Sequence, residues 1–303
     1  MTSAVQMGGI LLDGWGLLAL TAEGSGGQLS TFYRFATALS SGIAVSLPLI
    51  PAAGIGRRFF VLLSFISIVF LSLALAASGL AMSYFHLAAG GLLIAYNVLL
   101  PRERGVDVSA RREALQGGGG AFSRAAVSAV LGLAIACGLA GIVTDSLDGS
   151  RAAPGERPWL CAASLASTCL LGAATTAMVL GHWYLVSRKL SFTPLARLTL
   201  FLGSALLARA VVAGGAAWAQ AERWDGLISR SGMTGFLAGS GLFVLVRALF
   251  GFVAPAAFVA LTWRCIAIRS NQSATGILYV TLAFVLIGEI IAWHFLVSDG
   301  LIL

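Results

Sequence analysis

Charged residues are scarce in this chain. Of its 303 residues, 10% are charged and 58% are hydrophobic. An average soluble domain carries about 25% charged residues, so the composition excludes a water-soluble globular protein. Apolar runs of roughly 18 residues or more recur along the chain, and each is long enough to cross a hydrocarbon core of ~30 Å. The sequence therefore predicts a polytopic membrane protein.

The alternating segments of ~10 residues that are typical of a transmembrane barrel are also missing. Helices must then satisfy the backbone hydrogen bonds inside the membrane. We therefore predict an all-α fold, a polytopic integral membrane helix bundle with eight strong transmembrane helices. The expected spans are 33–54, 59–80, 82–100, 123–144, 159–187, 195–220, 235–267 and 275–298.

A candidate ninth span lies at 4–21. It is apolar but contains Asp13, and it lacks the positively charged region that begins a signal peptide. An interfacial helix fits this segment as well as a span does. We therefore separate an N-terminal segment, 1–30, from a single helix-bundle domain, 31–303.

The 19 basic residues lie mostly in every second connection between the expected spans. Basic connections orient helices with those loops on the cytoplasmic side, so we expect the C-terminus outside and no role in nucleic-acid binding. The basic connections contain Arg57, Arg58, Arg102, Arg104, Arg111, Arg112, Arg124, Arg188, Lys189, Arg197, Arg264 and Arg269.

Cysteine and histidine are few, with four and three residues. The cysteines lack CxxC spacing, so we expect no iron–sulfur cluster and no covalent haem in this chain. A metal site would need three or four convergent ligands, and we predict none. The longest connection, 101–122, is too short for a soluble catalytic domain, so any chemistry must occur within the bundle or in a partner.

Three ionisable residues inside the expected spans are candidates for a functional site, because charge is costly in the membrane. Arg209 and Glu289 each lie about 21 Å from the cytoplasmic start of their spans, so they share one level and can pair. Arg247, about 13 residues into its span, is expected near the middle. A structural Arg/Glu network and a site that handles protons or an anionic headgroup are both open.

Two histidines are expected near the outer face, each beside aromatic residues. His86 follows Tyr84 and Phe85, and His294 follows Trp293. Histidines among interfacial aromatics commonly contact lipid headgroups. A bis-histidine haem b is a further alternative for this pair.

A quinone site is the functional alternative. A quinone needs an apolar slot, hydrogen-bond partners for its carbonyl groups and a protonatable side chain connected to water. His86, Tyr84, Glu289 and Arg209 supply these residue types in one leaflet.

Three stretches resemble the membrane-anchor subunits of dimethyl-sulfoxide reductase and polysulfide reductase, the NrfD-like superfamily. They are Tyr84-Phe85-His86-Leu87, the segment from Pro158-Trp159 to His182-Trp183-Tyr184-Leu185, and Leu286-Ile287-Gly288-Glu289-Ile290-Ile291. The eight spans with the C-terminus outside agree with this resemblance. In the dimethyl-sulfoxide reductase anchors a Gly-Ser-Pro-like turn and an arginine follow the histidine, whereas Leu87-Ala88-Ala89-Gly90 follows here.

The resemblance implies a quinone-reactive subunit of a respiratory oxidoreductase in the bacterial inner membrane. It implies that His86 helps to bind a quinone, menaquinone or ubiquinone, near the outer face. It also implies that electrons pass to or from an iron–sulfur partner, which serves a molybdenum enzyme or a multihaem cytochrome.

We therefore expect the chain to be a membrane anchor that reacts with quinone but carries no haem or cluster. Glu289 is then the proton-handling residue, with His86, Tyr84, Arg209, Arg247 and His294 as binding residues. The alternatives are a secondary transporter with a buried Arg/Glu site, which predicts broken helices, and a non-catalytic structural subunit of a larger electron-transfer complex.

Overall fold

The computed structural model describes residues 31–51, 55–78, 83–100, 119–148, 153–186, 191–238 and 240–303. Nearly all of these residues are helical, and this part of the chain contains no strand, which confirms the predicted all-α fold. The α-helices are α2 (Thr31–Ser46), α3 (Arg57–Ala77), α4 (Tyr84–Leu99), α6 (Gly119–Asp148), α7 (Arg157–Val186), α8 (Thr193–Ala219), α9 (Ala221–Ala238), α10 (Ser240–Ala248), α11 (Ala254–Ala267) and α12 (Asn271–Ser298).

Six helical segments are long and apolar enough to cross a membrane, which indicates a membrane-embedded protein. The two remaining expected spans correspond to α2 and α4, which have 16 residues each. A perpendicular span takes about 20 residues, so eight spans are not established by helix length. The candidate span 4–21 lies outside the described residues. The six segments are Arg57–Ala77, Ala125–Leu147, Arg157–Val186, Thr193–Ala219, Gly241–Ala267 and Asn271–Ser298.

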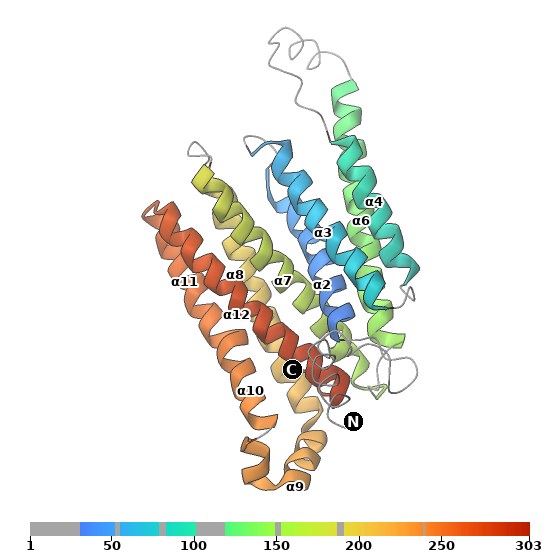
Figure 1. Cartoon of the computed structure of the whole chain (residues 1–303), viewed down its shortest axis with the longest axis vertical. Helices are drawn as coiled ribbons and strands as arrows, with labels where there is room; N and C mark the ends of the chain where they lie inside the picture. Colours follow the sequence, from blue (N-terminus) through green and yellow to red (C-terminus); the bar gives the residue numbers. More distant parts are fainter. Residues whose placement is uncertain are drawn as a thin grey trace, which may run out of the picture.

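Helix α7 lies between two groups of helices (Figure 1). It packs against α2 and α6 on one side and against α8 and α12 on the other. Its membrane segment is 72% buried within the protein, the largest share among the six. Small residues on α7 permit this close packing, as is usual where helices approach one another in membranes.

The closest approach is the crossing of α2 and α7. A Cβ atom added to Gly42 would overlap the carbonyl oxygen of Thr168, and one added to Gly172 would overlap Gly42 itself. The two backbones therefore touch directly, and only glycine fits at either position. This crossing fixes the helices that carry residues of both charged clusters described below.

The helices run alternately up and down, so that α2, α4 and α7 begin where α6, α8 and α12 end (Figure 1). We call this end the C-terminal end of the bundle. After α12 the chain turns back into it, and Leu301 and Leu303 are buried. Gln220 holds the turn, because its Nε2 donates to the Gly300 carbonyl oxygen (3.1 Å) and its Oε1 accepts from the Ile302 N–H (2.8 Å).

Candidate functional site

Arg209, Arg247 and Glu289 come together in one buried cluster, here called the Glu289 cluster. Arg247 Nη2 donates to Glu289 Oε1 at 2.8 Å, and Arg209 Nε lies 3.4 Å from Glu289 Oε2. The Ser167 hydroxyl donates to the same Oε2 at 2.6 Å and accepts from Arg209 Nε at 2.9 Å. Glu289 is fully buried, so two cations compensate one carboxylate away from water. The predicted pairing of Arg209 with Glu289 is confirmed.

Arg247 is held by an interruption in its own helical segment. The π-helix Leu249–Val253 joins α10 to α11, and such single-turn π-helices are frequent at functional sites. A Cβ added to Gly251 would overlap Arg247 Nη1, and one added to Gly288 would lie 2.8 Å from the same atom. The guanidinium carbon lies 4.2 Å from the centre of the Phe252 ring, a cation–π contact. Gly251, Gly288 and the Phe252 ring thus pack closely around this guanidinium.

Arg247 lies closer to a helix end than the sequence suggested. The apolar segment begins at Gly241, not at residue 235, so Arg247 is in its second turn. Helix α9, which has a non-helical break at Gly232, extends to Ala238, and α10 begins at Ser240. The expected span 235–267 began too early because an apolar run was counted as one continuous helix.

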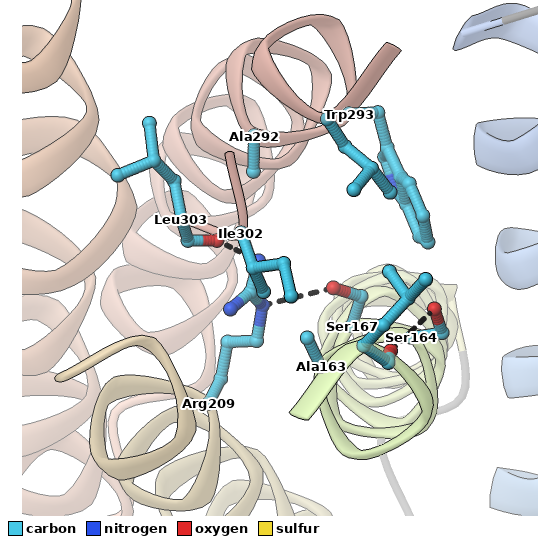
Figure 2. A pocket seen from close by; sticks show the side chains of 10 residues that line it. Ala163, Ser164, Ser167, Arg209, Ala292, Trp293, Ile302 and Leu303 are labelled. Atoms are coloured by element: carbon cyan, nitrogen blue, oxygen red, sulfur yellow. Dashed lines mark hydrogen bonds between the residues drawn. The ribbon is translucent and has the colours of Figure 1, made fainter. Parts of the chain in front are cut away.

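Arg209 makes further contacts beside Glu289. Its Nη2 donates to the main-chain oxygen of Leu303, which the turn after α12 brings into the bundle (Figure 2). Among the described residues, Arg209 Nη1 and Arg247 Nε and Nη1 are buried without a hydrogen-bond partner. The Glu289 cluster therefore holds unused hydrogen-bond donors as well as an excess of positive charge.

His86 belongs to a second cluster, here called the Asp145 cluster. Its Nε2 lies 3.0 Å from Asp145 Oδ2, and the Tyr33 hydroxyl donates to the same oxygen at 2.9 Å. The His86 side chain is fully buried, and a Cβ at Gly141 would lie 2.7 Å from its Cε1. The residues come from α4, α6 and α2, close to the C-terminal end of the bundle. His86 is thus a buried partner of a carboxylate and not a histidine exposed at the membrane interface.

Tyr84 and His294 join neither cluster. Tyr84 begins α4 with 89% of its side chain exposed, although it is only two residues from His86. His294 is exposed on α12, next to the buried Phe295. Successive residues of a helix point in different directions, so nearness in sequence to His86 did not place Tyr84 beside it. The predicted set of six residues therefore divides into three that meet, one that has other partners, and two on the surface.

Sequence reasoning missed Asp145, Tyr33 and Ser167. Asp145 was taken as part of a connection, because the apolar run ends at 144, but α6 continues to Asp148. One signal was available: Asp145 follows the apolar run directly, and an acidic residue there can turn inward within the last helical turn. Ser167 carried no comparable signal, since a serine in a small-residue helix usually bonds its own backbone.

A groove of about 410 Å³ opens between α8 and the π-helix with α11. Its lining is entirely apolar, and Phe252 forms part of its wall. The same Phe252 ring contacts Arg247. Phe252 therefore links the groove to the Glu289 cluster, whose three ionisable residues do not line the groove. Its lining residues are Gly203, Leu206, Leu207, Ala210, Phe252, Val253, Ala256 and Val259.

No group of three or more His, Cys, Asp or Glu side chains that could hold a metal ion occurs in the described parts of the chain. No protein-family profile, curated protein or solved structure matches the chain.

Proposed function

We propose that this chain is the membrane subunit of a respiratory oxidoreductase complex that exchanges electrons and protons with the quinone pool. In this proposal electrons pass to or from an iron–sulfur partner subunit, and the chain lies in the bacterial inner membrane as eight spans with its C-terminus outside. The observation that carries the proposal is an apolar groove whose wall residue Phe252 contacts Arg247, an arginine paired with the buried Glu289.

The groove fits the tail of a quinone. Ligand pockets commonly enclose ~300–1,000 Å³ and are mostly apolar, and this groove of about 410 Å³ is lined by apolar residues. A quinone carbonyl accepts hydrogen bonds, and Arg247, whose guanidinium contacts the groove residue Phe252, has unused N–H donors. A bound quinone would supply the transfer of two electrons with two protons.

Depth in the bundle argues against a phospholipid in this place. Arg209 lies ten residues before the end of α8 at Ala219, which corresponds to about 15 Å along the helix axis. That distance is about half of a ~30 Å hydrocarbon core, so a charged headgroup beside Arg209 would lie far from the membrane surface. An uncharged quinone ring pays no comparable desolvation cost.

The protein's own residues have distinct roles in this proposal. Arg209 and Arg247 form ion pairs with Glu289, which handles the proton, and the remaining N–H groups of Arg247 orient the ligand. Phe252 separates the groove from the guanidinium of Arg247 and limits access of lipid to the cluster. The Asp145 cluster, nearer the end of the bundle, exchanges protons with the outer aqueous phase.

Quinone binding tests the proposal directly. The chain, purified in mild detergent, is titrated with short-chain ubiquinone and menaquinone analogues while quenching of its tryptophan fluorescence is followed. We expect Gly203→Leu, which fills the groove, to weaken binding at least tenfold. Gly276→Leu on α12 is the matched control, because a Cβ at Gly276 has no atom within 4 Å. Failure of the unsubstituted chain to bind either analogue would refute the proposal.

Co-purification tests the predicted partner. Mass spectrometry of a mild-detergent preparation should detect a cysteine-rich iron–sulfur protein, and its absorption spectrum should show no haem that belongs to this chain. A preparation that contains the chain alone would contradict the role of an anchor subunit.

A secondary transporter is the second candidate, because the segment 241–267 is interrupted by the π-helix Leu249–Val253, which begins two residues after Arg247, the partner of Glu289. Interrupted helices beside a central charged site are typical of transporters. Proteoliposomes that show proton-coupled uptake of a small anion, abolished by Arg247→Met, would favour transport. Quinone binding that is sensitive to Gly203→Leu would favour the anchor.

A further inference from the structure

A small cavity lies beside two buried serines of α7, Ser164 and Ser167. It leaves about 10 Å³ for the centre of a water molecule, which is room for one. Ser164 and Ser167 lie on one side, and Arg209, Trp293 and Leu303 lie around it (Figure 2). The cavity is distinct from the apolar groove, because the two share no lining residue.

Two residues that line this cavity each carry a buried donor without a partner among the described residues. These donors are Arg209 Nη1 and the indole Nε1 of Trp293, and both side chains are at least nine-tenths buried. The hydroxyl oxygens of Ser164 and Ser167 supply acceptors. A buried water typically makes about three hydrogen bonds to polar groups that are otherwise unsatisfied. The cavity thus combines the size and the polar lining that one ordered water requires.

Hydroxyl groups continue from this cavity in both directions. On one side, Ser167 donates to Glu289 Oε2 at 2.6 Å. On the other side, the Ser146 hydroxyl lies 2.8 Å from that of Ser164, which joins α6 to α7. Ser146 follows Asp145 and lies two residues before the end of α6 at Asp148.

We propose that one ordered water in this cavity completes a hydrogen-bonded proton path from Glu289 through Ser167 and Ser164 to Ser146, at the C-terminal end of the bundle. Each hydroxyl accepts a proton on one lone pair and releases its own proton to the next group, so no charge remains on the serines. Ser164 now donates to the Leu160 carbonyl at 2.9 Å, and its hydroxyl must rotate toward the water to conduct. The direction in which protons move along this path rests on the proposed function.

The path leads from Glu289 toward the end of α6. Glu289 is too deeply buried to exchange protons with water directly. Ser146, itself buried, brings the path to within one helical turn of the end of α6 at Asp148. Protons that reach or leave Glu289 would therefore pass between α6 and α7, and not through the apolar groove.

The water itself can be detected without any activity. In a ¹⁵N-tryptophan-labelled sample, the Trp293 indole N–H, assigned by Trp293→Phe, should show cross-relaxation with a long-lived water. We expect Ser164→Val, which fills the cavity, to remove this signal, and Ser164→Ala, which leaves room, to keep it. Ser67→Val is the matched control: Ser67 is fully buried and its hydroxyl also meets a serine of another helix, Ser40.

Two results of the tryptophan measurement would contradict the proposal. A water signal at Trp293 that survives Ser164→Val, or no signal in the unsubstituted chain, would overturn the proposal. If Ser164→Val does not fold, a high-resolution map of the unsubstituted chain decides: density for a water within 3.2 Å of Trp293 Nε1 and Arg209 Nη1 supports it, and a cavity without density contradicts it.

Proton release tests the use of the path. In the purified complex in proteoliposomes, quinol-driven proton release is followed with a pH-sensitive dye. Ser164→Val should slow it at least tenfold while quinone affinity and the Ser67→Val control stay unchanged; unaltered release would refute the path. Absence of quinol-driven proton release from the unsubstituted complex would instead refute the proposed function. The tryptophan NMR measurement would still show whether the ordered water is present.

Discussion

The two buried clusters hold charge in the bundle by different means. In the Glu289 cluster, two arginines face one carboxylate, about 14 Å along α12 from the helix end, and glycine backbones close around Arg247. In the Asp145 cluster, the carboxylate lies three residues from the end of α6 and bonds a tyrosine hydroxyl and a histidine. The first depends on mutual neutralisation of full charges, whereas the second can be satisfied by neutral groups.

The largest effect is expected from Glu289→Gln. It removes the carboxylate that compensates Arg209 and Arg247, and breaking a buried ion pair from one side costs about 3–5 kcal/mol. We expect the free energy of unfolding in detergent, measured by denaturant titration with tryptophan fluorescence, to fall by that amount. Adding Arg247→Met to this variant should restore part of the loss, because it removes one of the stranded cations. Equal stability of Glu289→Gln and the unsubstituted chain would show that the cluster is not ionised.

Gly251→Ala is expected to cost about 1–3 kcal/mol, because an added methyl group overlaps the guanidinium of Arg247 and must displace it. Gly276→Ala is the control on α12, where a Cβ meets nothing within 4 Å. Alanine is the better helix former, so the control should be neutral or slightly stabilising. Equal changes in the free energy of unfolding for both substitutions would mean that the close packing around Arg247 does not restrict that side chain.

Tyr33→Phe tests the Asp145 cluster and should cost about 1–2 kcal/mol, since one hydrogen bond to a buried carboxylate is lost. The matched control is Tyr84→Phe, in a side chain that is 89% exposed, and it should leave the free energy of unfolding unchanged. The same denaturant titration compares the two. A cost at Tyr84 that matches the cost at Tyr33 would contradict the separation of these residues seen in the structure.

Composition was sufficient to predict the fold class. A chain with 10% charged residues and repeated apolar runs has few alternatives to a helical membrane bundle. The pairing of Arg209 with Glu289 was also predictable, because the rise per residue places both at one depth and an isolated intramembrane charge is costly. Depth along a helix depends only on the number of residues from the helix end, so the sequence predicts it well.

Direction around the helix axis and breaks in a helix were not predictable in the same way. Tyr84 and His86 lie at nearly one depth but on different faces of α4, and only packing shows which face is buried. The π-helix at Leu249–Val253 changes the phase of its segment just after Arg247, which pairs with Glu289. No residue pattern in the sequence predicted this π-helix. The roles of Ser167 and Ser164 depend on the side chains of α6, α8 and α12 that lie opposite them, and these contacts cannot be predicted from the sequence of α7 alone.

Asp145→Asn makes the comparison between the clusters exact, because it is the same change from carboxylate to amide as Glu289→Gln. An asparagine Oδ1 still accepts the hydrogen bond from Tyr33, and its Nδ2 can donate to His86 Nε2 if that nitrogen is unprotonated. We therefore expect a loss of only about 1 kcal/mol, the difference between charge-assisted and neutral hydrogen bonds. A loss as large as that of Glu289→Gln, measured by the same titration, would mean that His86 carries a positive charge. The Asp145 cluster would then be a second buried ion pair.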